Sequence, residues 1–193
     1  MLLVNAGLSV TLYKRYVDDS NIFCPPVSTD LEWDSKNRLL VKRDSSFDES
    51  TSPDQWTAEV LRNVAESVSP MLKWTADSPS SHDTGKMPVL DICLWTEETD
   101  SGTSFQYEFY SKPMANPVTV PANSAISHGV KLATYRQEVV RVLSNTSYSL
   151  PCAWKAELLS DMAWRIQKAG YGIGFIVTVL NGGIRAHAFL IIR

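Results

Sequence analysis

Two adjacent carboxylates, Asp18 and Asp19, are the residues of this 193-residue chain that most directly suggest chemistry. Two adjacent carboxylates repel each other unless they bind a cation, which a further acid can share. Mg²⁺ is such a cation, because it binds carboxylate oxygens together with the phosphates of a substrate. The pair therefore predicts a metal site. The alternative is a solvent-exposed turn, because Asp is also common in tight hairpin turns.

The residues on either side of the pair indicate a β-hairpin. Residues 10–17 are rich in β-branched and aromatic side chains, and residues 20–24 continue in the same way until Pro25 and Pro26 end the pattern. Two short strands joined at residues 18–19 would place both carboxylates at the tip of the hairpin.

The sequence YVDD at 16–19, between two short apolar strands, resembles the active-site motif of reverse transcriptases. Residues 52–95, 107–147 and 158–171 are similar to segments that follow this motif in retrotransposon polymerases, most nearly those of Penelope-like and related elements. In such elements, strands similar to KMPVLD and YSKP of this chain follow the catalytic hairpin, and a region identified as helix-turn-helix comes next. The resemblance covers nearly the whole chain.

The resemblance implies an RNA-directed DNA polymerase. Asp18 and Asp19 would be catalytic residues and ligands of Mg²⁺, in a site that holds two ions about 3.5–4 Å apart for nucleotidyl transfer. Tyr16 would lie near the primer end. The alternative interpretation is that its side chain packs in the hairpin core. The implied partner is an RNA or DNA template–primer, with no small-molecule cofactor.

The same resemblance indicates an incomplete active site. A polymerase palm needs a further Asp on an upstream strand, and residues 1–17 contain no acid. Asp91 is predicted to be a strand carboxylate, but the resemblance places it beyond the catalytic pair. We therefore expect a carboxyl-terminal fragment of a larger enzyme, without its fingers and inactive alone.

Composition indicates a globular chain, with 44% hydrophobic and 20% charged residues and a net charge of −3. Acids are concentrated in residues 44–54 and 97–100, whereas Lys and Arg outnumber acids in the last third. The cysteines at 24, 93 and 152 and the three histidines are scattered, which predicts neither a disulfide framework nor a zinc site.

The expected location is intracellular, in the cytoplasm or nucleus. The first residues do not have the pattern of a signal peptide, so none is expected. The apolar run at 173–180 is much shorter than the roughly 20 residues of a membrane helix, so we expect no membrane span.

The predicted fold class is α+β, with a partial polymerase palm at 1–115 and a helical thumb or helix-turn-helix-like region at 116–193. Beyond the first hairpin, the patterns predict strands at 31–33 and 38–42, and a helix from Ser52 to Pro70 that covers one face of the sheet. Its expected apolar face consists of Ala58, Leu61, Ala65 and Val68, widened by Val60 and Val64. A long hairpin is predicted from residues 87–95 and 104–111, and an extended connector at 117–121.

The carboxyl-terminal region is predicted to be helical from Ser127, and again from Pro151 to a glycine stop at Ala169–Gly170. Residues 175–180 alone are typical of a strand, but the resemblance indicates a helix. In the first helix, Val130, Tyr135, Val139, Val142 and Leu143 form the expected apolar face. Basic residues are expected largely off that face.

Basic residues at 112, 131, 136 and 141 are the predicted nucleic-acid contacts, together with Tyr16. Arg136 and Arg141 are expected to bind phosphates, Lys131 is expected to stand largely off the apolar face as they do, and Lys112 of the YSKP sequence could reach a phosphate. The alternative is a helical bundle whose basic side chains only face solvent. Two other functions stay open: a non-catalytic nucleic-acid-binding module, and a relic without biochemical role whose exposed strand edges would make it aggregate.

Overall fold

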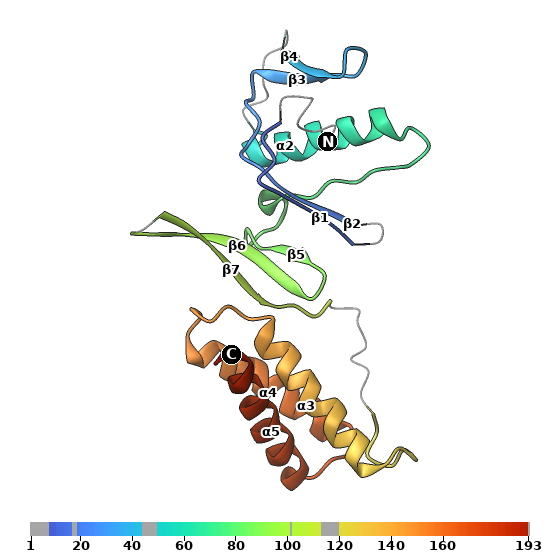
Figure 1. The fold of residues 1–193 in the computed structure, drawn as a ribbon, viewed down its shortest axis with the longest axis vertical. Coiled ribbons are helices and arrows are strands. Elements are labelled where there is room, and N and C mark those ends of the chain that lie inside the picture. The colour runs from blue at the N-terminus through green and yellow to red at the C-terminus, as the bar shows by residue number, and fades with distance from the viewer. Residues whose placement is uncertain (1–7, 17–18, 44–49, 101, 113–119, 193) are drawn as a thin grey trace. The chain divides into compact units, whose positions relative to one another are not determined.

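The computed structural model describes residues 8–16, 19–43, 50–100, 102–112 and 120–192 (Figure 1). The chain divides into two compact units, Met1–Met87 and Pro88–Arg193, and each is described by itself below. Both combine helix with small antiparallel sheets, so the predicted α+β class is confirmed.

Two hairpins form the strands of the first unit. β1 (Leu12–Tyr16) pairs with β2 (Asp19–Phe23), and β3 (Leu31–Asp34) pairs with β4 (Leu39–Lys42). The second turn is stabilised by the Asp34 carboxylate, which accepts hydrogen bonds from the backbone and side chain of Asn37. Both hairpins were predicted from alternation and turn residues.

Helix α2 (Pro53–Val68) begins with a capping box, in which Ser52 and Gln55 each bind the other's backbone N–H. It packs through Val60 and Val64 against a core that includes side chains of β3 and β4. The predicted face was partly wrong, because the widening valines lie at its centre and Val68 is 49% exposed.

The short helix η1 (Pro79–Ser81) is attached to the start of α2. The Ser80 N–H donates to Asp54 Oδ2 at 2.8 Å, and the Ser80 hydroxyl donates to both carboxylate oxygens of Asp54. Burial opposes the charge of Asp54, but its hydrogen bonds with Ser52 and Ser80 outweigh burial and lower its pKa to about 2.

A three-stranded sheet with the order β5-β6-β7 lies at the start of the second unit. Its strands are β5 (Met87–Val89), β6 (Ile92–Thr99) and β7 (Gly102–Phe109). The long β6–β7 hairpin confirms the prediction. The prediction of one strand over 87–95 was wrong, because a turn at Leu90–Asp91 divides it, with Leu90 at a φ of 55°.

Three helices follow, α3 (His128–Ser144), α4 (Cys152–Lys168) and α5 (Ile173–Ile191). Ser127 caps α3, and Gly170, with a φ of 92°, ends α4 as predicted. The core contains Val139, Ile166 and Val179, one from each helix. Residues 175–180 are helical rather than a strand, because every third or fourth residue of α5 packs on this core.

The segment at 120–124 is part of the helical bundle. The Val120 carbonyl oxygen accepts hydrogen bonds from the hydroxyls of Tyr135 and Tyr171 at 3.0 and 2.9 Å. The Ala122 N–H donates to the Ala169 carbonyl at 2.8 Å. The carboxyl-terminal end of the predicted connector is therefore held against the helical bundle by hydrogen bonds. The predicted boundary between 115 and 116 falls within the second unit and stays a prediction.

Helix α5 is long and apolar enough to cross a bilayer, judged by length and composition alone. The expected length of the apolar segment was wrong, because the helix continues from Leu180 to Ile191. One such helix is only a weak indication of a membrane span, and the absence of a span stays a prediction.

Candidate functional site

The β1–β2 hairpin carries the predicted metal site. Its register pairs Tyr16 with Asp19, so residues 17 and 18 connect the strands. The predicted ligand Asp18 lies outside the described residues, as do the side chains of Tyr16 and Asp19. In the backbone of this hairpin, Asp19 is the first residue of β2 and follows residues 17 and 18, which connect the two strands.

Elsewhere, the described residues contain no group of three or more His, Cys, Asp or Glu side chains that could hold a metal ion. Asp91, the other carboxylate considered, is in the turn before β6 rather than in a strand.

Lys131 is buried in the helical bundle, where its side chain is 6% exposed. Its Nζ donates to the carbonyl oxygens of Ala122 and Ser124, both at 2.7 Å. The expectation that Lys131 stands off the apolar face of α3 was wrong, and Val130, expected in that face, is exposed instead. The ammonium group holds the 120–124 segment on α3.

Arg136 is half-buried between α3 and α5. Its Nε is shielded from solvent and has no hydrogen-bond partner within the described part of the chain. A Cβ atom at Gly182 would overlap the Arg136 side chain, so a glycine of α5 makes room for it. Arg136 therefore packs against a neighbouring helix.

Arg141 forms ion pairs with two carboxylates. It binds Glu138 one turn earlier on α3 and Asp91 in the β5–β6 turn. The guanidinium carbon also lies 4.9 Å from the centre of the Phe109 ring. The bond to Glu138 raises the pKa of Arg141 above its usual value, and the bond to Asp91 adds to this effect. Partial burial opposes it.

The three basic residues of α3 point in different directions. A spacing of five residues turns a helix by about 140°, so Lys131, Arg136 and Arg141 cannot share one face. They contact the 120–124 segment, α5 and the β5–β6 turn respectively. Lys112 is exposed beyond the end of β7. The structure therefore does not bring the three α3 residues together on one surface.

Sequence reasoning missed the ion pair between Asp91 and Arg141. The i, i+3 spacing of Glu138 and Arg141 is a signal that indicates a pair on one helix. No local pattern connects α3 with a turn fifty residues earlier. The hydrogen bonds between Asp54 and Ser80 were missed for the same reason.

Comparisons of the chain with protein-family models, with curated proteins and with solved structures found no match. The fold and the carboxylate-bearing hairpin are therefore the basis for the functional proposal.

Proposed function

We propose that this chain is the carboxyl-terminal part of a reverse transcriptase, in which the β1–β2 hairpin carries two carboxylates of a nucleotidyl-transfer site. The observation that supports the proposal most is the hairpin register, in which Tyr16 opposes Asp19. That register makes Asp18 a connecting residue, beside Asp19 at the start of β2. The hairpin thus agrees with the position that the YVDD resemblance implies.

The donor set of the proposed site is two adjacent carboxylates, and Mg²⁺ prefers oxygen ligands of this kind. Asp18 and Asp19 would hold the ion, which when bound stabilises the negative charge that develops on a transferring phosphoryl group. Tyr16 would lie beside the primer end. The partner of this site is an RNA or DNA template–primer.

The proposal also requires a third carboxylate. In the resembling enzymes it comes from an upstream strand, and residues 1–17 contain no acid. We therefore expect metal binding at the hairpin without polymerisation by this chain alone. Metal binding is the property to test first.

The experiment is nuclear magnetic resonance of the ¹⁵N-labelled chain during titration with Mn²⁺, a paramagnetic substitute for Mg²⁺. We expect amide signals around Asp18 and Asp19 to broaden first and Mg²⁺ to compete. The double variant Asp18→Asn/Asp19→Asn should lose this broadening. Glu97 and Glu98, an adjacent pair of exposed acids near the end of β6, provide the internal control.

Broadening that is equal at the two acid pairs would contradict a specific metal site at the hairpin. Primer extension on a primed RNA template with Mg²⁺ gives a second test. Any extension should disappear in Asp18→Asn/Asp19→Asn, and extension that survives in this variant would sink the proposal.

A non-catalytic nucleic-acid-binding module has less support. Lys131 and Arg141, two of the basic residues expected to contact nucleic acid, bind carbonyl and carboxylate oxygens of the chain itself. Salt-dependent binding of a template–primer, measured with Arg136→Ala as a variant, tests this alternative.

A further inference from the structure

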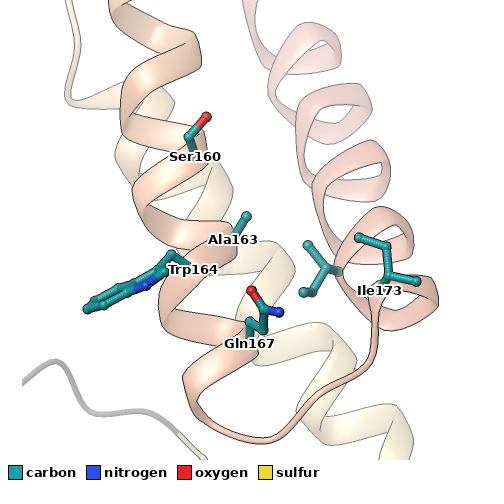
Figure 2. A pocket seen from close by; sticks show the side chains of 6 residues that line it. Ser160, Ala163, Trp164, Gln167 and Ile173 are labelled. Carbon is teal, nitrogen blue, oxygen red and sulfur yellow. The ribbon is translucent and has the colours of Figure 1, made fainter.

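The β6–β7 hairpin contributes no side chain to the buried core of the second unit. The described core consists of residues from α3, α4 and α5 and from the segments at 120–122 and 169–171. Figure 2 shows Ala163 of α4 pointing toward α5, and this side chain packs against the core. Within the described residues, no strand of the sheet packs along a helix of this unit. Few buried apolar contacts therefore attach the hairpin to the helices.

Polar contacts attach the hairpin at the middle of β7. Tyr107 and Ser147 exchange two hydrogen bonds, and the Ser149 hydroxyl donates to the side chain of Gln106. Gln106 and Ser147 are 7 and 4% exposed, so these bonds are shielded from water. Both serines belong to the short loop between α3 and α4. We call this attachment the joint.

A second attachment lies at the base of the hairpin. Arg141 of α3 binds the Asp91 carboxylate just before β6, and its guanidinium carbon lies 4.9 Å from the ring centre of Phe109 in β7. Asp91 and Phe109 lie at the same end of the hairpin, because the Tyr110 N–H donates to the Asp91 carbonyl at 2.8 Å. The side chains of Arg141 and Asp91 are 39 and 56% exposed, so salt screens this pair.

The joint lies between the base and the tip of the hairpin. In β7, Tyr107 is two residues from Phe109 and five residues from Gly102, where the strand begins. At a rise of about 3.4 Å per residue, the base is about 7 Å from the joint and the tip about 17 Å. The tip residues 96–99 and 102–103 are all exposed. A rotation about the joint therefore moves the tip furthest, and the ion pair at the base opposes this rotation.

We infer that the β6–β7 hairpin is a hinged arm, with the joint as its pivot and the Arg141–Asp91 ion pair as a salt-sensitive latch. Regions with few buried apolar contacts open locally while the core stays folded. When the ion pair breaks, the buried joint stays in place, so the hairpin rotates as a unit. Glu138 also binds Arg141 and keeps the guanidinium on α3 when Asp91 leaves.

Residual dipolar couplings test the inference, because they report the orientation of each N–H bond. The ¹⁵N-labelled full chain is aligned in a stretched polyacrylamide gel. At about 0.01 M salt, couplings from β6 and β7 should fit the same alignment as those from α3, α4 and α5. At about 1 M salt the Debye length shortens to about 3 Å, and the hairpin couplings should shrink relative to the helical ones. Strand chemical shifts check that the hairpin is still formed.

Arg141→Met should give small hairpin couplings even at low salt, and added salt should then change them little. An exposed ion pair shifts an equilibrium by up to about fivefold, so we expect a partial decrease. Arg165→Met is the matched control. It removes the same charge, but the ion pair that it breaks, with Asp161, lies within α4. Its couplings should match those of the wild type at both salt concentrations.

Three results would overturn the inference. They are wild-type hairpin couplings that salt does not change, hairpin couplings in Arg141→Met equal to the wild type at low salt, and an equal decrease in Arg165→Met. The helical couplings in each sample check that the bundle is folded. The proposed metal site lies on a different hairpin, in the first unit, so these results and the test of metal binding are independent.

Discussion

Tyr107 and Ser147 are joined by two hydrogen bonds although forty residues separate them. The Tyr107 N–H donates to Ser147 Oγ at 2.8 Å, and the Ser147 N–H donates to the Tyr107 carbonyl at 2.7 Å. Close by, the Ser149 hydroxyl donates to Gln106 Oε1 at 2.6 Å. The loop between α3 and α4 therefore pairs with the backbone N–H and C=O groups of Tyr107 at the edge of β7, as a further strand would. These hydrogen bonds connect the β6–β7 hairpin to the helices.

Ser147→Ala should destabilise the second unit by about 1–2 kcal/mol, because it leaves the Tyr107 N–H without its acceptor. Urea unfolding followed by circular dichroism measures the change. The exposed Ser144→Ala, at the end of α3, is the control and should change stability little. Equal midpoints for the two variants would show that the hydrogen bond contributes nothing.

Arg141 and Asp91 should stabilise the same connection by less than about 1 kcal/mol. Both side chains are partly exposed, and solvent screens such pairs. A double-mutant cycle of Arg141→Met and Asp91→Asn gives the coupling energy, which should fall further at high salt. A coupling that does not respond to salt would argue against an ionic contribution.

Gly183→Ala should destabilise the chain by about 1–3 kcal/mol through overpacking. A Cβ atom at Gly183 would overlap the Val139 side chain where α5 crosses α3. At Gly174, in the first turn of α5, nothing lies within 4 Å of an added Cβ. Gly174→Ala should leave thermal stability unchanged or raise it by up to about 1 kcal/mol. Similar melting temperatures for the two variants would rule out a close crossing.

His187 should make stability depend on pH. Burial, and then the positive charge of Lys155, lowers the pKa of His187 below its usual value of 6.5. As the pH falls through 6.5, His187 is protonated in the unfolded chain before it is protonated in the folded chain. The free energy of unfolding is therefore highest above pH 6.5 and decreases below it.

Melting temperatures measured above and below pH 6.5 would show this dependence. His187→Gln should reduce it and Lys155→Met should reduce it in part. An unchanged pH profile in both variants would mean that other groups cause the dependence.

Local patterns in the sequence predicted much of the fold. The cap at Ser52, the start of α3 after Ser127 and the glycine stop at Gly170 were all predicted, because each depends on the chemistry of a few adjacent residues. The two hairpins of the first unit were predicted by the same kind of reasoning. For the candidate site, the sequence indicated the hairpin that carries Asp18 and Asp19.

Tertiary structure decided how individual side chains are used. Lys131 is a surface cation by residue type, but two carbonyl oxygens of the 120–124 segment hold its ammonium group in the bundle. Arg141 is paired with Asp91, and residues 175–180 are helical because they pack on α3 and α4. These outcomes depend on groups that are distant in the sequence and become neighbours only when the chain folds.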